Sequence, residues 1–213
     1  LGLYAKAIEI GREAFDILGS PLPEKTTPEI VDQEYAKILE IIKQNDNSLE
    51  KALEKVRKEK TATWTHQSIQ ILASDLMPSS FLAGDLPLHC LLSFISVVCT
   101  LENGVCESSC FGFSGSAFSV QSFYGPSKIV ASLCIAAEKL AFETGISLNI
   151  ARSMTQCGVV SHCCGSKERT KQIFDVAMTH GMKAHDLVHS GYSIVFASWI
   201  LFSAGMNLQK LET

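Results

Sequence analysis

The chain has 213 residues, of which 46% are apolar and 19% are charged, and its formal net charge is −4 at pH 7. This composition excludes a disordered chain, and the length allows one ordinary domain to bury a core without disulfides or metals. With 18 Lys and Arg against 22 Asp and Glu, the chain has no basic excess to neutralise phosphates, which argues against nucleic-acid binding. We therefore expect a single domain over residues 1–213.

Neither a membrane span nor a signal peptide is predicted. The longest apolar stretch, Gly191 to Met206, is shorter than the roughly 20 residues that a bilayer requires, and it contains Ser and Gly throughout. Charged residues such as Lys6 and Glu9 interrupt the first segment, which is unlike a signal peptide. We expect a cytoplasmic protein.

The eight cysteines include no C-x-x-C pair, the usual mark of a structural zinc site. Most of them stand in apolar runs, where cysteine packs as a small hydrophobic residue. Free thiols, a reducing compartment and no metal site are therefore expected. The cysteines are Cys90, Cys99, Cys106, Cys110, Cys134, Cys157, Cys163 and Cys164.

The helices that we expect in chain order are marked by periodicity and by capping residues. Thr27 followed by Pro28 indicates a helix start, Ser48 is a good N-cap, and Gly145 is a typical helix stop. The segment 30–42 is apolar, and its end is ambiguous between helix and strand. Helices are expected over residues 2–11, 30–42, 49–60, 88–100, 129–143, 166–180 and 186–199.

Short apolar runs between these helices predict strands. They lie at residues 69–73, 105–110, 146–150 and 207–211, and loops are expected at 78–87 and 111–127. Helices that alternate with short strands are typical of a parallel sheet. The expected fold class is therefore α/β: a Rossmann-like, doubly wound, mostly parallel sheet with helices on both faces.

The segment with the clearest chemistry is Tyr124-Gly-Pro-Ser-Lys128, which leads into the helix 129–143. A tyrosine and a lysine four positions apart lie on one face of a helix. A nearby ammonium lowers the pKa of a phenol, because it stabilises the phenolate. Such a phenol can exchange a proton with a substrate oxygen near neutral pH.

From Tyr124 the chain reads YGPSKIVASLCIAAEKLAFETGISLN, which resembles the catalytic helix and the following strand of short-chain dehydrogenases/reductases. The segment from Gly104 to Gly112 is similar to the family's strand that ends in its catalytic serine. Residues 185–211 are similar to its last helix, a turn at Ala204-Gly205 and the final strand. Residues 2–18 resemble the end of its glycine-rich turn, the first helix and the second strand.

The sequence departs from the family pattern at several positions. The first strand and most of the glycine-rich turn are missing before Leu1, and Tyr4 stands where the last glycine is usual. Residues 74–77 replace the family's Asn-Asn-Ala-Gly, and the loop between Ser109 and Tyr124 carries two extra residues. These departures favour a rival interpretation, a non-catalytic Rossmann-like protein used for binding or assembly.

The resemblance implies a role for each matching catalytic residue. Tyr124 would be the general acid/base, and Lys128 would lower its pKa and hold the nicotinamide ribose. Ser109 would bind the substrate oxygen, with Ser114 as a substitute, and His89 falls at the place of the family's active-site asparagine.

The resemblance also implies a cofactor site. Gly2 and Leu3 would lie near the pyrophosphate, Asp46 would meet the adenine, and Lys128 would contribute through the ribose. Ser20 or a neighbouring residue occupies the place of the cofactor-selecting carboxylate, and without that charge NADP is slightly favoured over NAD. No metal is implied.

The function that follows is an NAD(P)-dependent oxidoreductase that interconverts a small-molecule alcohol and a ketone. The family commonly assembles into homodimers or homotetramers, and the apolar helices 88–100 and 129–143 are the expected contacts. Other polar groups are assigned to the surface or the core, namely the histidines at 180, 185 and 189 and the segment His162-Cys163-Cys164.

Overall fold

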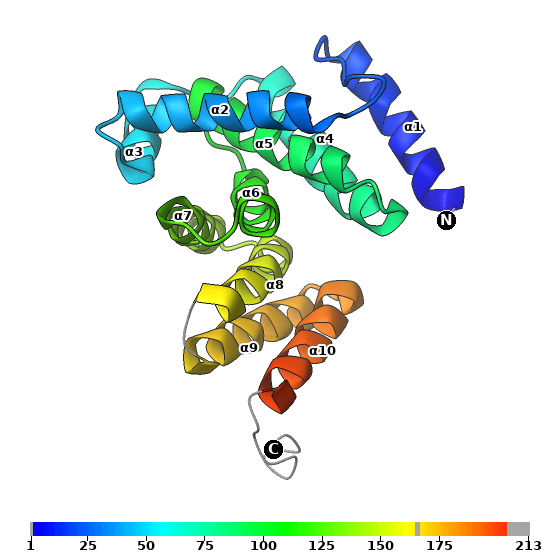
Figure 1. Ribbon diagram of the computed structural model, residues 1–213, viewed down its shortest axis with the longest axis vertical. Helices are drawn as coiled ribbons and strands as arrows, with labels where there is room; N and C mark the ends of the chain where they lie inside the picture. Colours follow the sequence, from blue (N-terminus) through cyan, green and yellow to red (C-terminus); the bar gives the residue numbers. More distant parts are fainter. Residues whose placement is uncertain (1, 165–166, 204–213) are drawn as a thin grey trace.

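The computed structural model describes residues 2–164 and 167–203, and throughout this part of the chain the protein is helical (Figure 1). The described residues form ten α-helices and no strand, so the predicted parallel sheet is wrong. The N-terminal helices are α1 (Gly2–Ile17), α2 (Pro28–Gln44), α3 (Leu49–Glu59), α4 (Trp64–Ala83) and α5 (Leu86–Asn103). The C-terminal helices are α6 (Ser109–Tyr124), α7 (Lys128–Thr144), α8 (Ser147–Cys164), α9 (Lys167–Lys183) and α10 (Leu187–Ser203).

The helices stack largely in chain order. Short connections fold each helix back on the previous one, which is the usual arrangement of antiparallel helical neighbours. From α4 to α10 each helix packs on the next, and α8 also contacts α6 and α10. The first three helices pack at the N-terminal end of this stack: α1 lies on α4, α2 on α5, and α3 contacts α5 and α7 (Figure 1).

Two helix boundaries, at Ser48 and Gly145, confirm the capping chemistry expected from the sequence, and a third, at Thr27, confirms the position of the helix start but not the expected hydroxyl cap. Helix α2 begins at Pro28, although the hydroxyl of Thr27 makes no capping bond. The Oγ of Ser48 accepts a hydrogen bond from the backbone N–H of Lys51 at the start of α3. Gly145 ends α7 with a φ of 65°, a left-handed conformation that glycine adopts without a steric penalty.

The strand expected at residues 69–73 is the middle of α4. Its buried residues continue beyond that run as Ile69, Ala73, Leu76, Met77 and Ser80, which is a spacing of three and four typical of a helix. The loop expected at 78–87 is also mostly helical, because Pro78 lies inside α4 and the chain turns only at Gly84 and Asp85.

The loop expected at residues 111–127 is mainly α6, and its small residues allow close helix packing. A Cβ placed on Gly112 would lie 2.1 Å from the Oγ of Ser96 in α5. A Cβ placed on Gly115 would lie 2.8 Å from the Sδ of Met77 in α4. Glycine and serine in this segment therefore bring α4, α5 and α6 together, and do not form a loop.

The other strands predicted within the described residues are also wrong. Residues 105–110 form the link into α6, and residues 146–150 lead into the first turn of α8. The second strand implied at the end of residues 2–18 belongs to α1, and the ambiguous segment 30–42 lies inside α2. The predicted strand 207–211 and the turn at Ala204-Gly205 lie outside the described residues.

Helix α5 is the centre of the core. Among the described residues it is the one helix long and apolar enough to cross a membrane, but 72% of that 18-residue window is buried inside the protein. This burial is typical of a central core helix. It also means that α5 has no free apolar face for the subunit contact expected at residues 88–100.

Candidate functional site

The Tyr124–Lys128 pair is not arranged as the helix-face argument requires. Tyr124 is the last residue of α6, and the helix ends at Gly125, which has a φ of 82°. Lys128 begins the next helix, α7. The Tyr124 hydroxyl donates to Oδ1 of Asp32, and its ring lies 4.7 Å from that of Tyr35. Burial, together with the Asp32 carboxylate, raises the pKa of Tyr124, which is the opposite of the expected direction.

Ser109 is a buried structural hydroxyl at the start of α6. Its Oγ donates to Oε1 of Gln70 at 2.6 Å and accepts from the backbone N–H of Cys106 at 2.9 Å. The substitute residue Ser114 is buried within α6, where its hydroxyl bonds to the carbonyl of Phe111 and to Oε1 of Gln156. Both hydroxyls therefore hold helices in place.

The residues expected to bind a cofactor are spread over separate elements. Gly2 and Leu3 begin α1, and Leu3 is 86% exposed. Ser20 follows α1, where its backbone N–H bonds to the carbonyl of Phe15. Asp46 lies in the turn between α2 and α3 and pairs with Lys51 at 2.8 Å.

The resemblance to short-chain dehydrogenases/reductases is therefore wrong. A Rossmann-type cofactor site lies at the carboxyl ends of parallel strands, and the described residues contain no sheet to provide them. The oxidoreductase function and the catalytic set that rested on this family are corrected with it. Of the residues that the resemblance selected, His89 lines a pocket between helices, which is not a Rossmann-type active site.

This pocket lies between the C-terminal end of α4, the start of α5, and helices α6, α8 and α10. Its cavity volume is about 140 Å³, and its lining is mostly aromatic and aliphatic. Ring contacts join the lining across helices, for example Phe81 to Phe118 at 5.8 Å between centroids. The lining residues are Pro78, Phe81, Leu82, His89, Phe111, Phe118, Thr155, Gln156, Val159, Val188, His189, Tyr192 and Phe196.

His89 is a buried polar group of this pocket with one nitrogen unused. His89 is 3% exposed, and Nδ1 of its imidazole lies 3.0 Å from the carbonyl oxygen of Met77. A carbonyl can only accept, so Nδ1 carries the proton and Nε2 is an acceptor. Nε2 is buried and has no hydrogen-bond partner. The rings of Phe81 and Phe118 lie within 5.8 Å of the imidazole.

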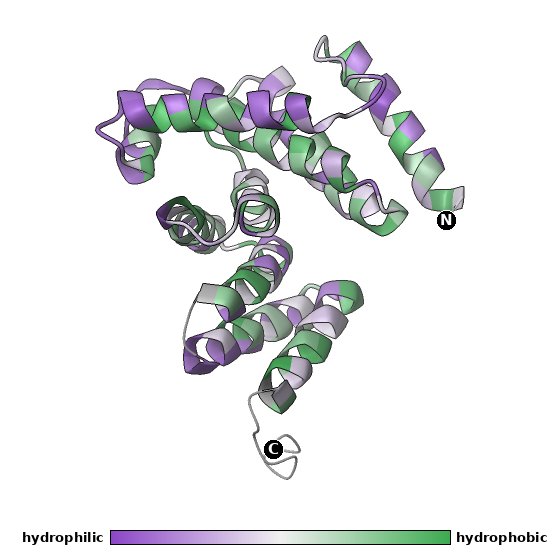
Figure 2. Ribbon diagram, viewed as in Figure 1, coloured by the Kyte–Doolittle hydropathy of each residue, from purple (hydrophilic) through white to green (hydrophobic). Residues whose placement is uncertain are grey.

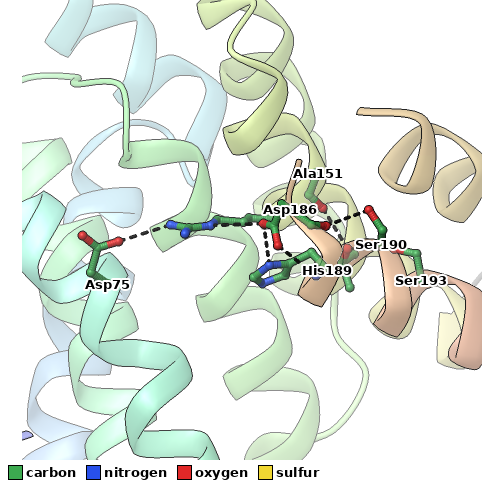
Figure 3. Close-up of polar contacts among 8 residues, drawn as sticks. Asp75, Ala151, Asp186, His189, Ser190 and Ser193 are labelled. Atoms are coloured by element: carbon green, nitrogen blue, oxygen red, sulfur yellow. Dashed lines mark hydrogen bonds and ion pairs between the residues drawn. The ribbon is translucent and has the colours of Figure 1, made fainter. Parts of the chain in front are cut away.

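A second histidine of the pocket, His189, is held by a polar cluster at the start of α10 (Figure 3). Oδ1 of Asp186 accepts from the backbone N–H of His189 at 3.1 Å, and Oδ2 lies 2.9 Å from the Nδ1 of His189. Nη1 of Arg152 in α8 lies 3.2 Å from Oδ1 of Asp75 in α4, and Nε of Arg152 lies 3.7 Å from Oδ2 of Asp186. The cluster therefore ties α10 to α8 and α4.

Further hydroxyl contacts anchor α10 beside the pocket (Figure 3). The hydroxyl of Thr155, which bonds to the carbonyl of Ala151, also lies 2.9 Å from that of Ser193. Ser190 donates to the carbonyl of Asp186 at 2.7 Å. The wall of the pocket that α10 supplies is therefore positioned by hydrogen bonds as well as by packing.

Both histidines are neutral at pH 7, since burial lowers the pKa of each. For His189 this desolvation outweighs the Asp186 carboxylate, which favours the charged form, and the Arg152 guanidinium lowers the pKa further. Burial alone would raise the pKa of Asp186, but its bonds to His189 and the nearby Arg152 hold it below the usual range. A neutral His89 presents an acceptor to whatever occupies the pocket.

A larger cavity of about 220 Å³ between α3 and α7 is a weaker candidate. Its rim carries ion pairs, including Lys139 with Glu50 at 3.8 Å. None of the buried polar atoms that lack a partner belongs to its lining. This cavity therefore lacks the unpartnered buried acceptor that His89 supplies in the other pocket.

The described residues contain no group of three His, Cys, Asp or Glu side chains placed to hold a metal ion. The seven cysteines whose side chains are described form no disulfide with one another. Cys163 is exposed. For Cys164, the last residue of α8, the structure describes the backbone alone.

Sequence reasoning selected His89 for a role in a different fold and assigned His189 to the surface or the core. The sequence did contain one signal for the cluster. Asp186 stands three positions before His189, and an N-cap side chain accepts a hydrogen bond from the backbone N–H at that spacing. The pocket lining as a whole had no comparable signal, since its residues come from five helices far apart in the chain.

Comparison with family models, with curated proteins and with solved structures finds no match to this chain.

Proposed function

We propose that this protein binds a small aromatic ligand that carries one O–H or N–H donor, such as a phenol or an indole, in the pocket between α4, α6 and α10. The observation that carries the proposal is Nε2 of His89, a buried acceptor without a partner next to an apolar cavity. Buried polar groups are nearly always hydrogen-bonded, so an exception beside a cavity indicates a missing donor.

The size and lining of the pocket support a ligand that places one aromatic ring in the cavity. A cavity of about 150 Å³ lined by apolar side chains holds a benzene molecule, and this pocket has about 140 Å³. Aromatic side chains such as Phe111, Phe118 and Phe196 favour a flat ring, because edge-to-face contacts between rings are attractive. Phe81 covers His89 and is 45% exposed, so a ligand reaches Nε2 by displacing a ring that already faces solvent.

The experiment compares two ligands that differ only in the donor. 4-Fluorophenol and 4-fluorotoluene have nearly the same shape, and the fluorine signal of each reports binding by NMR titration. A hydrogen bond to a neutral acceptor contributes about 0.5–1.5 kcal/mol. We therefore expect the phenol to bind up to about tenfold more tightly than the toluene.

Two variants of His89 assign that difference to Nε2. His89→Phe keeps a ring but has no acceptor, and His89→Asn keeps an amide N–H for the Met77 carbonyl while removing Nε2. Both should bind the two ligands equally, with an unchanged helical circular dichroism spectrum. Val159→Phe fills the cavity and should weaken both ligands together. Equal affinity of the unmodified protein for phenol and toluene would refute the proposal, as would the absence of any binding.

A further inference from the structure

The outer face of α10 is apolar and exposed, and one edge of it borders the pocket. At 3.6 residues per turn Trp199 falls between the pocket residues Val188 and Tyr192, and its ring lies 6.3 Å from that of His162 in α8. With Trp199, the exposed side of the helix carries five large apolar residues around two small ones, Gly191 and Ser198. We call these seven residues the α10 outer face. Its apolar members are Leu187, Ile194, Val195, Trp199 and Phe202, with exposed fractions of 72%, 49%, 63%, 60% and 62%.

We propose that a second copy of this chain covers the α10 outer face, with two α10 helices packed antiparallel about a twofold axis. The five residues expose roughly 600 Å², which is most of the roughly 800 Å² that each partner buries in a standard interface. Monomeric proteins rarely expose a contiguous apolar patch of this size, so it marks a binding surface.

The charge distribution favours self-association over a lipid surface or a charged partner. No Asp, Glu, Lys or Arg occurs between Leu187 and Ser203, so Figure 2 shows mainly green and pale residues along α10. A helix that lies on a membrane typically carries Lys and Arg along its polar side, which α10 lacks. Two uncharged faces meet without like-charge repulsion, and antiparallel helices oppose their dipoles.

The positions of the small residues specify the register. Gly191 and Ser198 lie at equal distances from the midpoint between Ile194 and Val195, so in an antiparallel pair each faces the other on the second copy. A Cβ on Gly191 would meet nothing within 4 Å, so this position leaves space for a partner helix. In the same register Leu187 of one copy faces Phe202 of the other. The arrangement is self-complementary, as a twofold interface must be.

The first test measures molar mass by light scattering at about 20 µM, where a specific dimer of ordinary affinity is fully formed. The unmodified chain should be a dimer. Val195→Lys places a charge in the centre of the face and should give a monomer with an unchanged circular dichroism spectrum. Ile135→Lys is the matched control, because Ile135 is a 66% exposed apolar residue in the middle of α7. This control should remain dimeric.

A second test addresses the register. In Leu187→Glu/Phe202→Lys each new glutamate would face a lysine of the second copy, whereas in Leu187→Glu/Phe202→Glu it would face another glutamate. We expect the Glu/Lys variant to dimerise at least about tenfold more tightly than the Glu/Glu variant, with a dependence on salt.

Several outcomes would overturn the proposal. A monomeric unmodified chain at this concentration would do so, whether or not it sediments with phosphatidylcholine vesicles. A dimer that survives Val195→Lys would place the contact elsewhere. Equal dimerisation of the Glu/Lys and Glu/Glu variants would rule out the antiparallel register.

Discussion

Gln70 and His89 are buried polar side chains at opposite ends of the layer formed by α4, α5 and α6, and they differ in how completely they are bonded. Oε1 of Gln70 lies within hydrogen-bond distance of the hydroxyls of Thr100 and Ser109 and the thiol of Cys106, and Nε2 donates to the carbonyl of Gly104. His89 uses one ring nitrogen and leaves the other without a partner.

Packing explains the difference. Towards Gln70 the three helices approach closely through small residues such as Gly112, and their polar groups reach each other directly. At His89 the neighbours are large rings, which meet edge to face and leave a cavity. One end of the layer is therefore structural, and the other end can accept a ligand.

The largest expected effect comes from removing the side-chain amide at the structural end. Gln70→Leu leaves several buried groups without partners and should lower the free energy of unfolding by about 3 kcal/mol. Gln156→Leu is the matched control, because Gln156 is half-buried beside the pocket and accepts one bond, from Ser114. It should cost about 1 kcal/mol or less. Urea unfolding followed by circular dichroism measures both, and similar losses would contradict the comparison.

A smaller effect tests the close approach of α5 and α6. Gly112→Ala places a Cβ against Ser96, whose short side chain has little room to move, and should destabilise by about 1–3 kcal/mol. Gly191→Ala on the open side of α10 should stabilise by up to about 1 kcal/mol, since alanine favours the helix. Both are measured in a Val195→Lys background so that self-association does not contribute. Destabilisation by both changes would show that space is not the deciding factor.

The last effect is a pH dependence of stability that belongs to the ligand end. Burial lowers the pKa of His89 in the folded state below its ordinary value of 6.5, so the unfolded chain binds more protons as the pH falls. Stability should therefore be full above about pH 7 and decline towards pH 5, at up to about 1.4 kcal/mol per pH unit for one proton.

His189 contributes in the same direction, because its folded pKa is also lowered. His89→Phe should therefore flatten the stability–pH profile without abolishing the dependence. Denaturant midpoints measured across this range provide the profile. A slope that is unchanged in His89→Phe would mean that His89 does not titrate on unfolding.

Local chemistry allowed some of the fold to be predicted from the sequence. The N-cap at Ser48 and the left-handed stop at Gly145 depend on one residue and its immediate neighbours, and both were expected. Residues 69–73 were predicted to be a strand because a short apolar run is compatible with a strand as well as a helix. The helical spacing becomes clear only when the window extends to Ser80.

The Gly- and Ser-rich segment of α6 shows that composition alone does not distinguish a loop from a closely packed helix. Small residues are typical of loops, but they also occur where two helices pack closely, and only the neighbouring helix distinguishes the two cases. The dehydrogenase resemblance accumulated short matches such as Tyr124 and Lys128, each of which occurs by chance in many chains. The pocket could not be predicted, because Phe81, Phe118 and Tyr192 are brought together only by the stacking of helices.

The chain-order stacking of the helices has a consequence for how the protein opens. Because α9 and α10 pack mainly on each other and on α8, their contacts close short loops, and the entropy of closing such loops is small. These helices can therefore detach and re-form as one cooperative unit while α5 stays protected in the core. A pocket with one wall on α10 and the rest on α4–α8 lies across that boundary, so an occupant would slow the opening of the C-terminal end and raise its protection from solvent exchange.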